Sequence, residues 1–237
     1  LLVSTDTGSL YCFSKISVDV KRVPPKNEAE KVVPVNLVKR LVQMSRATHG
    51  WALVTDLVDG SLCAALAENT HLNIIGVSRD LKKVTLARKY LAKCGLYGNR
   101  VSISFVSGDT FPFTDYFANL IISESALLGG NRSRLASDEW KRMLQPYNGV
   151  AWLHPDDKPY MSKGLAGAGE WTHQYGNPAN TSNSGDALVH SDLVLQWFGG
   201  PGAAPMVDRH LRAPAPLAAK GRLIIPGENI VIALDAY

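Results

Sequence analysis

The sequence predicts an α/β protein with a doubly wound, mostly parallel sheet and a β-hairpin at each end of the chain. From Trp51 to His154, strand-like and helix-like segments alternate, which is typical of βαβ units with right-handed crossovers. The strand-like runs are largely apolar, as expected for strands that are covered on both faces. At each end of the chain an apolar run, a short polar turn and a second apolar run follow one another, which is the pattern of a hairpin.

Hydrophobic periodicity places the elements between the hairpins. We expect strands at residues 51–57, 73–78, 101–107, 117–123 and 149–154. We expect helices at residues 35–45, 60–69, 80–94 and 137–145. The first of these helices has apolar residues at three- and four-residue spacing, which gives it one apolar face. Ser137 is followed by two acidic residues, so we expect it to be the N-cap of the last helix.

The two ends of the chain resemble each other. When Leu1–Ser14 is placed over Arg222–Asp235 without a gap, apolar residues coincide in both strands of the pattern. Repeated hairpins of this kind are typical of β-propeller blades. Two copies leave chance similarity as the alternative.

These patterns divide the chain into five segments. They are a propeller-type hairpin at 1–15, a linker and helix at 16–48, the α/β domain at 49–158, an irregular connection at 159–221 and a second propeller-type hairpin at 222–237. The chain begins without Met and ends directly after a strand-like run, so we expect a fragment of a longer protein.

Composition narrows the classes of function. The chain has 237 residues, of which 46% are hydrophobic and 19% charged, as in ordinary globular proteins. The net charge of +4 comes without a long run of one sign, so no nucleic-acid partner is indicated. No apolar stretch approaches the ~20 residues that span a bilayer. The three cysteines are far apart, which indicates neither a metal site nor a disulfide framework.

Polar residues gather at the predicted strand ends, which is where ligands bind in open α/β sheets. Asp56, Asp59 and Gly60 follow the first strand, and Ser78 and Asp80 follow the second. The third strand is followed by Asp109, and the fourth ends in Ser123 and Glu124. We expect Asp80 to start the next helix as its N-cap.

Residues 47–154 resemble class I S-adenosylmethionine-dependent methyltransferases. In that family the first strand ends in an acid and a G-x-G-x-G turn, and "DLVDGSL" places Asp56 on the acid and Gly60 on the central glycine. Val58 and Leu62 stand at the outer glycine positions, where a side chain would crowd the turn. "IIGVSRD" places Ser78 where the family has an acid that holds the ribose, "SGDTFPF" keeps the acid of the third strand, and "DYFANLIISES" resembles the fourth-strand motif beside the methyl-transfer pocket.

The resemblance implies a Rossmann-like, methyltransferase-like fold with S-adenosylmethionine as the cofactor. The candidate cofactor-binding residues are Asp56, Asp59, Gly60, Ser78 and Asp109. The alternative to an N-cap role for Asp80 is that it replaces the ribose-binding acid, which requires its loop to bend back. Asp109 would accept from the adenine amino group, and Glu124 lies where a substrate pocket would open. No catalytic residue is predicted, and the methyl acceptor is unknown.

A second resemblance covers the flanks. The two end hairpins and the segment that begins "GEWTHQYGNPANTSNSGDALV" are similar to bacterial proteins with pyrroloquinoline-quinone-type propeller repeats. This resemblance implies that the partner of the α/β domain is the remainder of a propeller in the parent chain. An exported parent chain would place the protein in the cell envelope or periplasm.

Three functions remain open at this point. The domain is an S-adenosylmethionine-dependent methyltransferase-like enzyme with a damaged cofactor turn, a non-catalytic structural or interaction module that retains the Rossmann fold, or a binder of a different nucleotide at the same sheet edge. S-adenosylmethionine is a cytosolic metabolite, so an exported parent chain favours the non-catalytic module.

Overall fold

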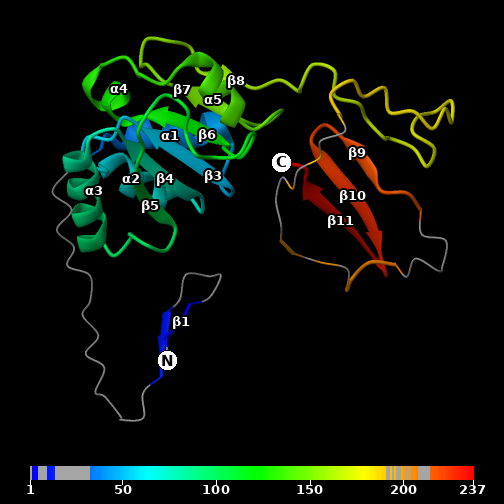
Figure 1. The fold of residues 1–237 in the computed structure, drawn as a ribbon, viewed down its shortest axis with the longest axis horizontal. Coiled ribbons are helices and arrows are strands. Elements are labelled where there is room, and N and C mark those ends of the chain that lie inside the picture. The colour runs from blue at the N-terminus through cyan, green and yellow to red at the C-terminus, as the bar shows by residue number, and fades with distance from the viewer. Residues whose placement is uncertain are drawn as a thin grey trace. The chain divides into compact units, whose positions relative to one another are not determined.

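The computed structural model describes residues 2–4, 10–13, 33–190, 193, 195, 199, 200, 202, 204–207 and 214–237 (Figure 1). Contacts divide the chain into two compact units, which are described separately below. The first unit holds most residues up to Met161, and the second holds Thr114–Tyr116, Gln145–Tyr147 and Ser162–Tyr237.

A six-stranded sheet organises the first unit. Its strands are β3 (Trp51–Thr55), β4 (Asn73–Ser78), β5 (Val101–Phe105), β6 (Leu120–Ser123), β7 (Val150–Trp152) and β8 (Tyr160–Met161). Their order is β5-β4-β3-β6-β7-β8, and all pairs are parallel except β7 with β8. The chain winds outward from β3 through β4 to β5 and then returns to the other side of β3 with β6. The sheet is therefore Rossmann-like, with its switch point between β3 and β6.

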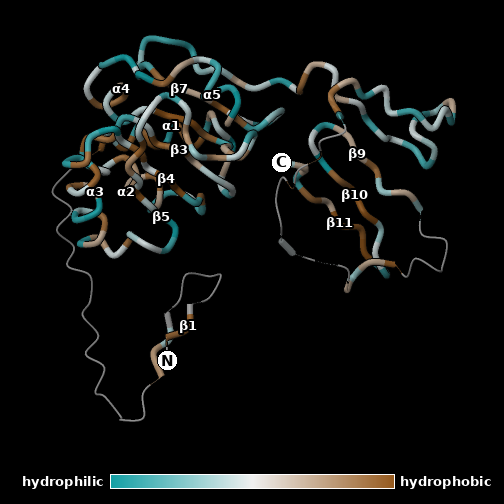
Figure 2. Tube along the Cα trace, viewed as in Figure 1, coloured by the Kyte–Doolittle hydropathy of each residue, from teal (hydrophilic) through white to brown (hydrophobic). Residues whose placement is uncertain are grey.

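Helices and loops cover both faces of this sheet. The helices are α1 (Val35–Ser45), α2 (Ser61–Asn69), α3 (Leu81–Lys93), α4 (Glu124–Gly129) and α5 (Ser137–Met143). One hydrophobic cluster joins α1, α2 and α3 to the sheet, and a second joins α5 and residues 111–118 to the opposite face. Figure 2 shows the hydrophobic colouring concentrated on the strands between these layers.

The alternation of side chains along β3 connects both clusters. Ala52 and Val54 belong to the cluster under α1–α3, and Leu53 belongs to the other. All three are fully buried, because successive side chains of a strand point to opposite faces. A central strand that is covered on both faces accounts for the uninterrupted apolar run in the sequence.

Most predicted elements are confirmed, with differences at their ends. The helix at 35–45 and the strand at 73–78 have the predicted bounds, whereas the strand predicted at 117–123 begins only at Leu120. The prediction for Ser137 is wrong: Ala136 is the N-cap of α5, without a side-chain cap, and Ser137 is the first helical residue. The short elements α4 and β8 were not predicted.

A hairpin is confirmed near each end of the chain. β1 (Leu2–Ser4) pairs with β2 (Leu10–Cys12), and β10 (Arg222–Gly227) pairs with β11 (Ile230–Asp235). The registers differ by one residue from the predicted superposition. Leu2 pairs with Cys12, whereas Leu223, its aligned counterpart, pairs with Leu234. A one-residue slip exchanges the two faces of a strand, so the propeller-type interpretation of the hairpins stays a prediction.

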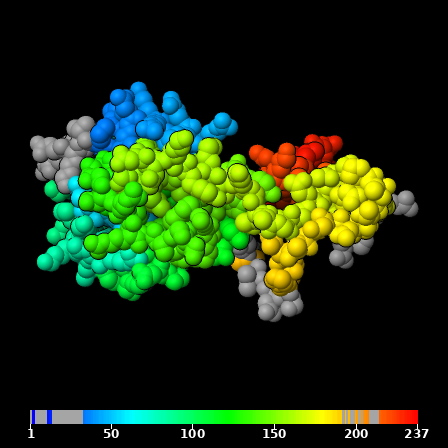
Figure 3. All heavy atoms as spheres, turned by 90° about the horizontal axis from the view of Figure 1, so that it is seen from above, coloured from blue at the N-terminus to red at the C-terminus, as the bar shows by residue number. Residues whose placement is uncertain are grey.

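The second unit contains a three-stranded antiparallel sheet in the order β11-β10-β9, in which β9 spans Leu217–Ala219. An isolated bridge joins Trp171 to Ala218 through hydrogen bonds of 2.7 and 2.8 Å in the two directions. The irregular segment around Trp171 therefore lies beside this sheet (Figure 3). Within the described residues, no helix is long and apolar enough to cross a membrane.

Candidate functional site

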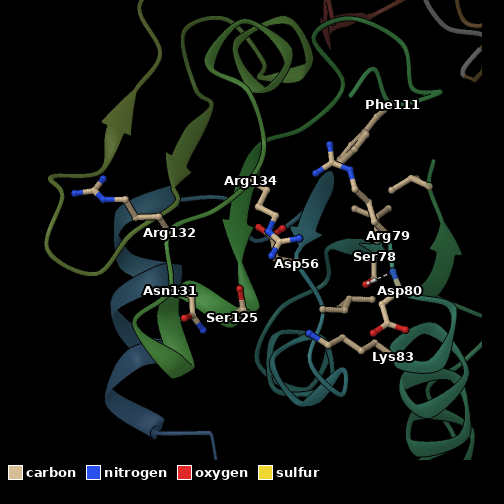
Figure 4. A pocket seen from close by; sticks show the side chains of 13 residues that line it. Asp56, Ser78, Arg79, Asp80, Lys83, Phe111, Ser125, Asn131, Arg132 and Arg134 are labelled. Atoms are coloured by element: carbon tan, nitrogen blue, oxygen red, sulfur yellow. Dashed lines mark hydrogen bonds between the residues drawn. The ribbon is translucent and has the colours of Figure 1, made fainter. Parts of the chain in front are cut away.

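A cavity of about 570 Å³ opens at the carboxyl ends of the strands beside the switch point. Its walls come from the ends of β3 and β4, from the segment after β5, and from α4 with the loop that follows it (Figure 4). Polar and charged lining residues are Asp56, Ser78, Arg79, Asp80, Lys83, Ser125, Asn131, Arg132 and Arg134; apolar ones are Leu57, Val77, Val106 and Phe111. Ligand pockets of this architecture occupy the same place.

Asp56 ties three parts of the cavity wall together. Its Oδ2 accepts hydrogen bonds from the hydroxyl groups of Ser133 at 2.6 Å, Ser123 at 2.9 Å and Thr55 at 3.2 Å. Its backbone has a positive φ of 50°, a conformation that Asp tolerates better than most residues. Asp56 lines the cavity, and one of its oxygens is already engaged by the protein itself. Its predicted contact with a cofactor stays a prediction.

Glu124 binds the turn that carries the motif resemblance. Its carboxylate is fully buried. Oε2 accepts hydrogen bonds from the backbone N–H groups of Val58, Asp59 and Gly60, and Oε1 accepts one from Leu62. The expectation that Glu124 faces a substrate pocket is therefore wrong, because its side chain does not line the cavity and closes the N-terminal end of α2 instead. A carboxylate at this end also interacts favourably with the helix dipole.

Asp59 and Gly60 serve the same turn. Asp59 accepts a hydrogen bond of 2.9 Å from the backbone N–H of Ser61. Gly60 has φ of +83°, and a Cβ at this position would lie 3.0 Å from the Cβ of Ala87. Gly60 is therefore required by the packing of α2 against α3 and by its own backbone. Neither residue lines the cavity, and their predicted cofactor contacts stay predictions.

The outer glycine positions of the turn do not obstruct the cavity. Leu62 is fully buried in the core under α1–α3, and the Val58 side chain is 39% exposed. Neither belongs to the cavity lining. Both large side chains are therefore accommodated outside the ligand space.

Ser78 and Asp80 form the wall at the end of β4. The Ser78 Oγ accepts a hydrogen bond of 3.1 Å from the backbone N–H of Asp80, drawn as a dashed line in Figure 4. Asp80 is the N-cap of α3, as predicted, and its side chain accepts a hydrogen bond of 2.8 Å from the backbone N–H of Lys82. Both side chains line the cavity together with Asp56.

Asp109 lies apart from these residues. Its side chain is 94% exposed and forms an ion pair of 3.1 Å with Arg79. It does not line the cavity, whereas Arg79 does. Arg79 also donates to the Gly108 carbonyl at 2.9 Å and stands 5.7 Å from the centre of the Phe111 ring. The predicted contact of Asp109 with an adenine stays a prediction.

Two side chains of α5 hold the backbone of the cavity wall around Phe111. Glu139 accepts a hydrogen bond of 2.6 Å from the backbone N–H of Phe111. Arg142 donates to both carboxylate oxygens of Glu139 and to the carbonyl groups of Phe111 and Phe113. The hydrogen bonds from Arg142 are the main cause that lowers the pKa of Glu139 below its ordinary value; burial opposes them, and the Phe111 N–H adds to the lowering.

Four basic side chains of the cavity escaped the sequence analysis: Arg79, Lys83, Arg132 and Arg134. Two of them come from the segment "NRSR" that follows α4. A signal for these two was present, since the basic segment begins eight residues after the end of β6. They lie far from the glycine-turn motif in the sequence, so the sequence does not show that they line the same cavity.

The described residues contain no cluster of three or more His, Cys, Asp or Glu side chains that could hold a metal ion. Cys63, in the first turn of α2, is free and buried. Burial above all, and then the negative charges of Glu124 and Asp59, raise the pKa of its thiol well above the ordinary value. A thiol in this state is a poor nucleophile.

No protein-family model and no curated protein matches the chain. Among solved structures, a candidate S-adenosyl-L-methionine-dependent methyltransferase from Methanococcus maripaludis is 21% identical, with 49% of this chain and 52% of that one covered at a TM-score of 0.44. A candidate sarcosine dimethylglycine methyltransferase from Galdieria sulphuraria is 17% identical, and the match covers 49% of this chain and 44% of that one at a TM-score of 0.41. The [4+2]-cyclase SpnF is 18% identical, and the match covers 49% of this chain and 43% of that one at a TM-score of 0.41. The match spans about half of the first protein and less than half of the other two, and the Rossmann-like fold is assigned from this chain's own strand order and register.

Proposed function

We propose that the cavity beside β3 and β4 binds S-adenosylmethionine, and that the first unit is a methyltransferase-like domain acting on a second ligand. The observation that carries this proposal is the position of the cavity at the switch point of the sheet, where nucleotide cofactors bind in this architecture. Its volume of about 570 Å³ suits a ligand of this size. The motif resemblance of residues 47–154 favours S-adenosylmethionine over other nucleotides.

The residues present fit the nucleoside part of this cofactor. Asp80 keeps a second carboxylate oxygen beyond the one that caps α3, and with Ser78 it offers hydrogen-bond partners for ribose hydroxyl groups. Val106 and Phe111 add apolar surface on the same side of the cavity, suited to a base. The base and the ribose would therefore lie along the ends of β4 and β5.

The remainder of the cofactor would depend on side chains from α4 and its loop. The N–H groups of residues 58, 59, 60 and 62 already donate to Glu124. Ser125 and Asn131 line the opposite wall of the cavity (Figure 4). When bound, S-adenosylmethionine supplies an electrophilic methyl group. The task of this chain is then to position a second ligand in line with it.

A non-catalytic module is the second candidate function. It is favoured by the use of both central acids as structural ties. Asp56 binds three hydroxyl groups and Glu124 binds four backbone N–H groups. An acid engaged in this way holds loops together and has less capacity to accept a substrate proton.

Calorimetric titration with S-adenosylmethionine and S-adenosylhomocysteine tests the proposal. We expect a dissociation constant below about 1 mM and a loss of about tenfold in Asp80→Asn, in which the amide preserves the helix cap. Asp109→Asn is the matched control, because that side chain lies outside the cavity, and it should change the affinity less than about twofold. Absence of heat with both ligands would overturn the proposal in favour of the non-catalytic module. A larger loss in Asp109→Asn than in Asp80→Asn would move the site to the exposed loop.

A further inference from the structure

We propose that the second ligand of the cavity, the methyl acceptor, is a small molecule with a phosphate or carboxylate group that is held between Lys83 and Arg134. Its role as acceptor rests on the proposed function, whereas the oxyanion site itself rests on the charges and anchoring of the cavity wall.

The cations of the cavity wall differ in whether they have an acidic partner. Four basic and two acidic side chains line the cavity, and Asp109 and Asp157 outside the lining pair with two of the basic ones. The formal charges of this group balance, so the net charge does not select the ligand. An unpaired cation in a cleft attracts an anionic group, whereas S-adenosylmethionine, with a sulfonium, an ammonium and a carboxylate group, is itself a net cation.

Two of the four cations are available to a ligand. Arg79 is engaged by Asp109 and the Gly108 carbonyl, and Arg132 pairs with Asp157 at 3.5 Å. Among the described residues, Lys83 and Arg134 have no hydrogen bond or ion pair. In Figure 4, Lys83 extends from α3 toward the middle of the cavity, whereas Arg132 points away from it.

Arg134 is held over the cavity from both sides along the chain. The preceding Ser133 donates a hydrogen bond of 2.6 Å to Asp56, and the following Leu135 is buried in the second hydrophobic cluster. The backbone N–H of Leu135 also donates to the Ser133 Oγ at 3.3 Å. An arginine with both neighbours fixed loses less conformational freedom when it binds.

Lys83 stands on an equally fixed element. It lies in the first turn of α3, whose N-cap Asp80 is part of the same cavity wall. The next residue, Val84, and Ala87 are fully buried against the sheet. A guanidinium and an ammonium from opposite walls can together bind one oxyanion, the first through paired N–H donors and the second as a point charge.

Titration with inorganic phosphate, followed by calorimetry and phosphorus NMR at low salt, tests the site. We expect millimolar binding that weakens with added salt, because both side chains are exposed. Arg134→Gln and Lys83→Gln should each weaken it by about fivefold or more. Lys82→Gln removes the same charge at a neighbouring position of α3 that does not line the cavity, and it should change the affinity less than about twofold. No phosphate binding, or equal losses in test and control variants, would overturn the site.

A second arm separates the acceptor from the carboxylate of S-adenosylmethionine itself. Phosphate should bind with the same affinity when S-adenosylmethionine is saturating. Competition between the two would mean that Lys83 and Arg134 serve the cofactor, and would overturn the assignment to the acceptor. If S-adenosylmethionine does not bind while phosphate binding depends on both cations, the proposed function fails and the oxyanion site is supported.

Discussion

The carboxylate of Glu124, directly after β6, accepts a hydrogen bond of 2.9 Å from the backbone N–H of Leu62 in the first turn of α2. Three further N–H groups of the same turn donate to it. The donors of a helix N-terminus need partners when they are buried. Here the first residue of α4 supplies one carboxylate for all four donors, so the conformation of the turn is fixed by the protein's own contacts.

Glu124→Gln should lower the free energy of unfolding by about 3 kcal/mol. The amide provides one acceptor oxygen in place of two, and its NH₂ group faces backbone donors. Urea denaturation measures the loss. Glu68→Gln, an exposed change on α2, should stay within about 0.5 kcal/mol of the wild type. Equal unfolding midpoints for the two variants would contradict the assigned role of Glu124.

Gly60→Ala should destabilise the fold more than Gly98→Ala. Both glycines have positive φ, of +83° and +91°, and an alanine in this region costs about 1 kcal/mol. Only at Gly60 would the new Cβ meet neighbours, with Ala87 at 3.0 Å and Leu91 at 3.3 Å. We expect an additional loss of about 1–2 kcal/mol at Gly60 from this crowding. Thermal unfolding of both variants separates the cost of the positive φ, which they share, from the cost of the Cβ contact, which only Gly60→Ala has. Similar losses of stability in the two variants would show that α3 moves away from the new Cβ.

The positions of the strands could be predicted because the buried strands are apolar on both faces and are followed by turns. β4 is an example: its predicted and observed bounds agree at residues 73–78. α4 could not be found in this way. Its six residues begin directly after β6, and one and a half turns are too short to show a helical period.

The candidate site could be predicted only in part. Asp56 and Ser78 line one cavity because parallel strands end at the same edge of the sheet. The direction of a side chain beyond a strand end depends on the loop around it. Glu124 turns beneath the neighbouring loop, whereas Arg134, ten residues later, reaches the cavity through the bond between Ser133 and Asp56. No local pattern in the sequence encodes that bond.

The thiol of Cys63 should resist modification in the folded protein. Its pKa is raised, first by burial and then by the charges of Glu124 and Asp59, so the reactive thiolate is scarce at about pH 8. Cys12 is exposed and should react first. Brief alkylation followed by peptide mass spectrometry measures both. Modification of Cys63 at the rate of Cys12 would show that the turn opens in solution.

Glu139 should give the fold an acid-sensitive contribution. Its pKa is lowered in the folded protein, mainly by Arg142. Its stabilisation is therefore fully present above the ordinary Glu pKa of about 4.3 and is lost as the pH falls through the lower folded value. Glu139→Gln should be less stable at neutral pH and lose less stability on acidification. Unfolding free energies of the wild type and the variant at several pH values test this. If the unfolding free energy of Glu139→Gln fell with decreasing pH as steeply as that of the wild type, Glu139 would not be the source of the acid sensitivity.

Ser133→Ala tests whether the loop anchor positions Arg134. The variant removes the 2.6 Å bond to Asp56, while the bonds from Ser123 and Thr55 to the same oxygen remain. We expect a modest loss of about 1 kcal/mol in unfolding free energy. Phosphate affinity should fall by about threefold or more, because a loosened Arg134 has to be ordered on binding. Ser133→Thr keeps a hydroxyl group and should restore most of the affinity.

Adding Arg134→Gln to Ser133→Ala should produce little further loss of phosphate affinity if both changes act on one contact. Fully additive losses would show that Ser133 acts on binding by a route that does not involve Arg134.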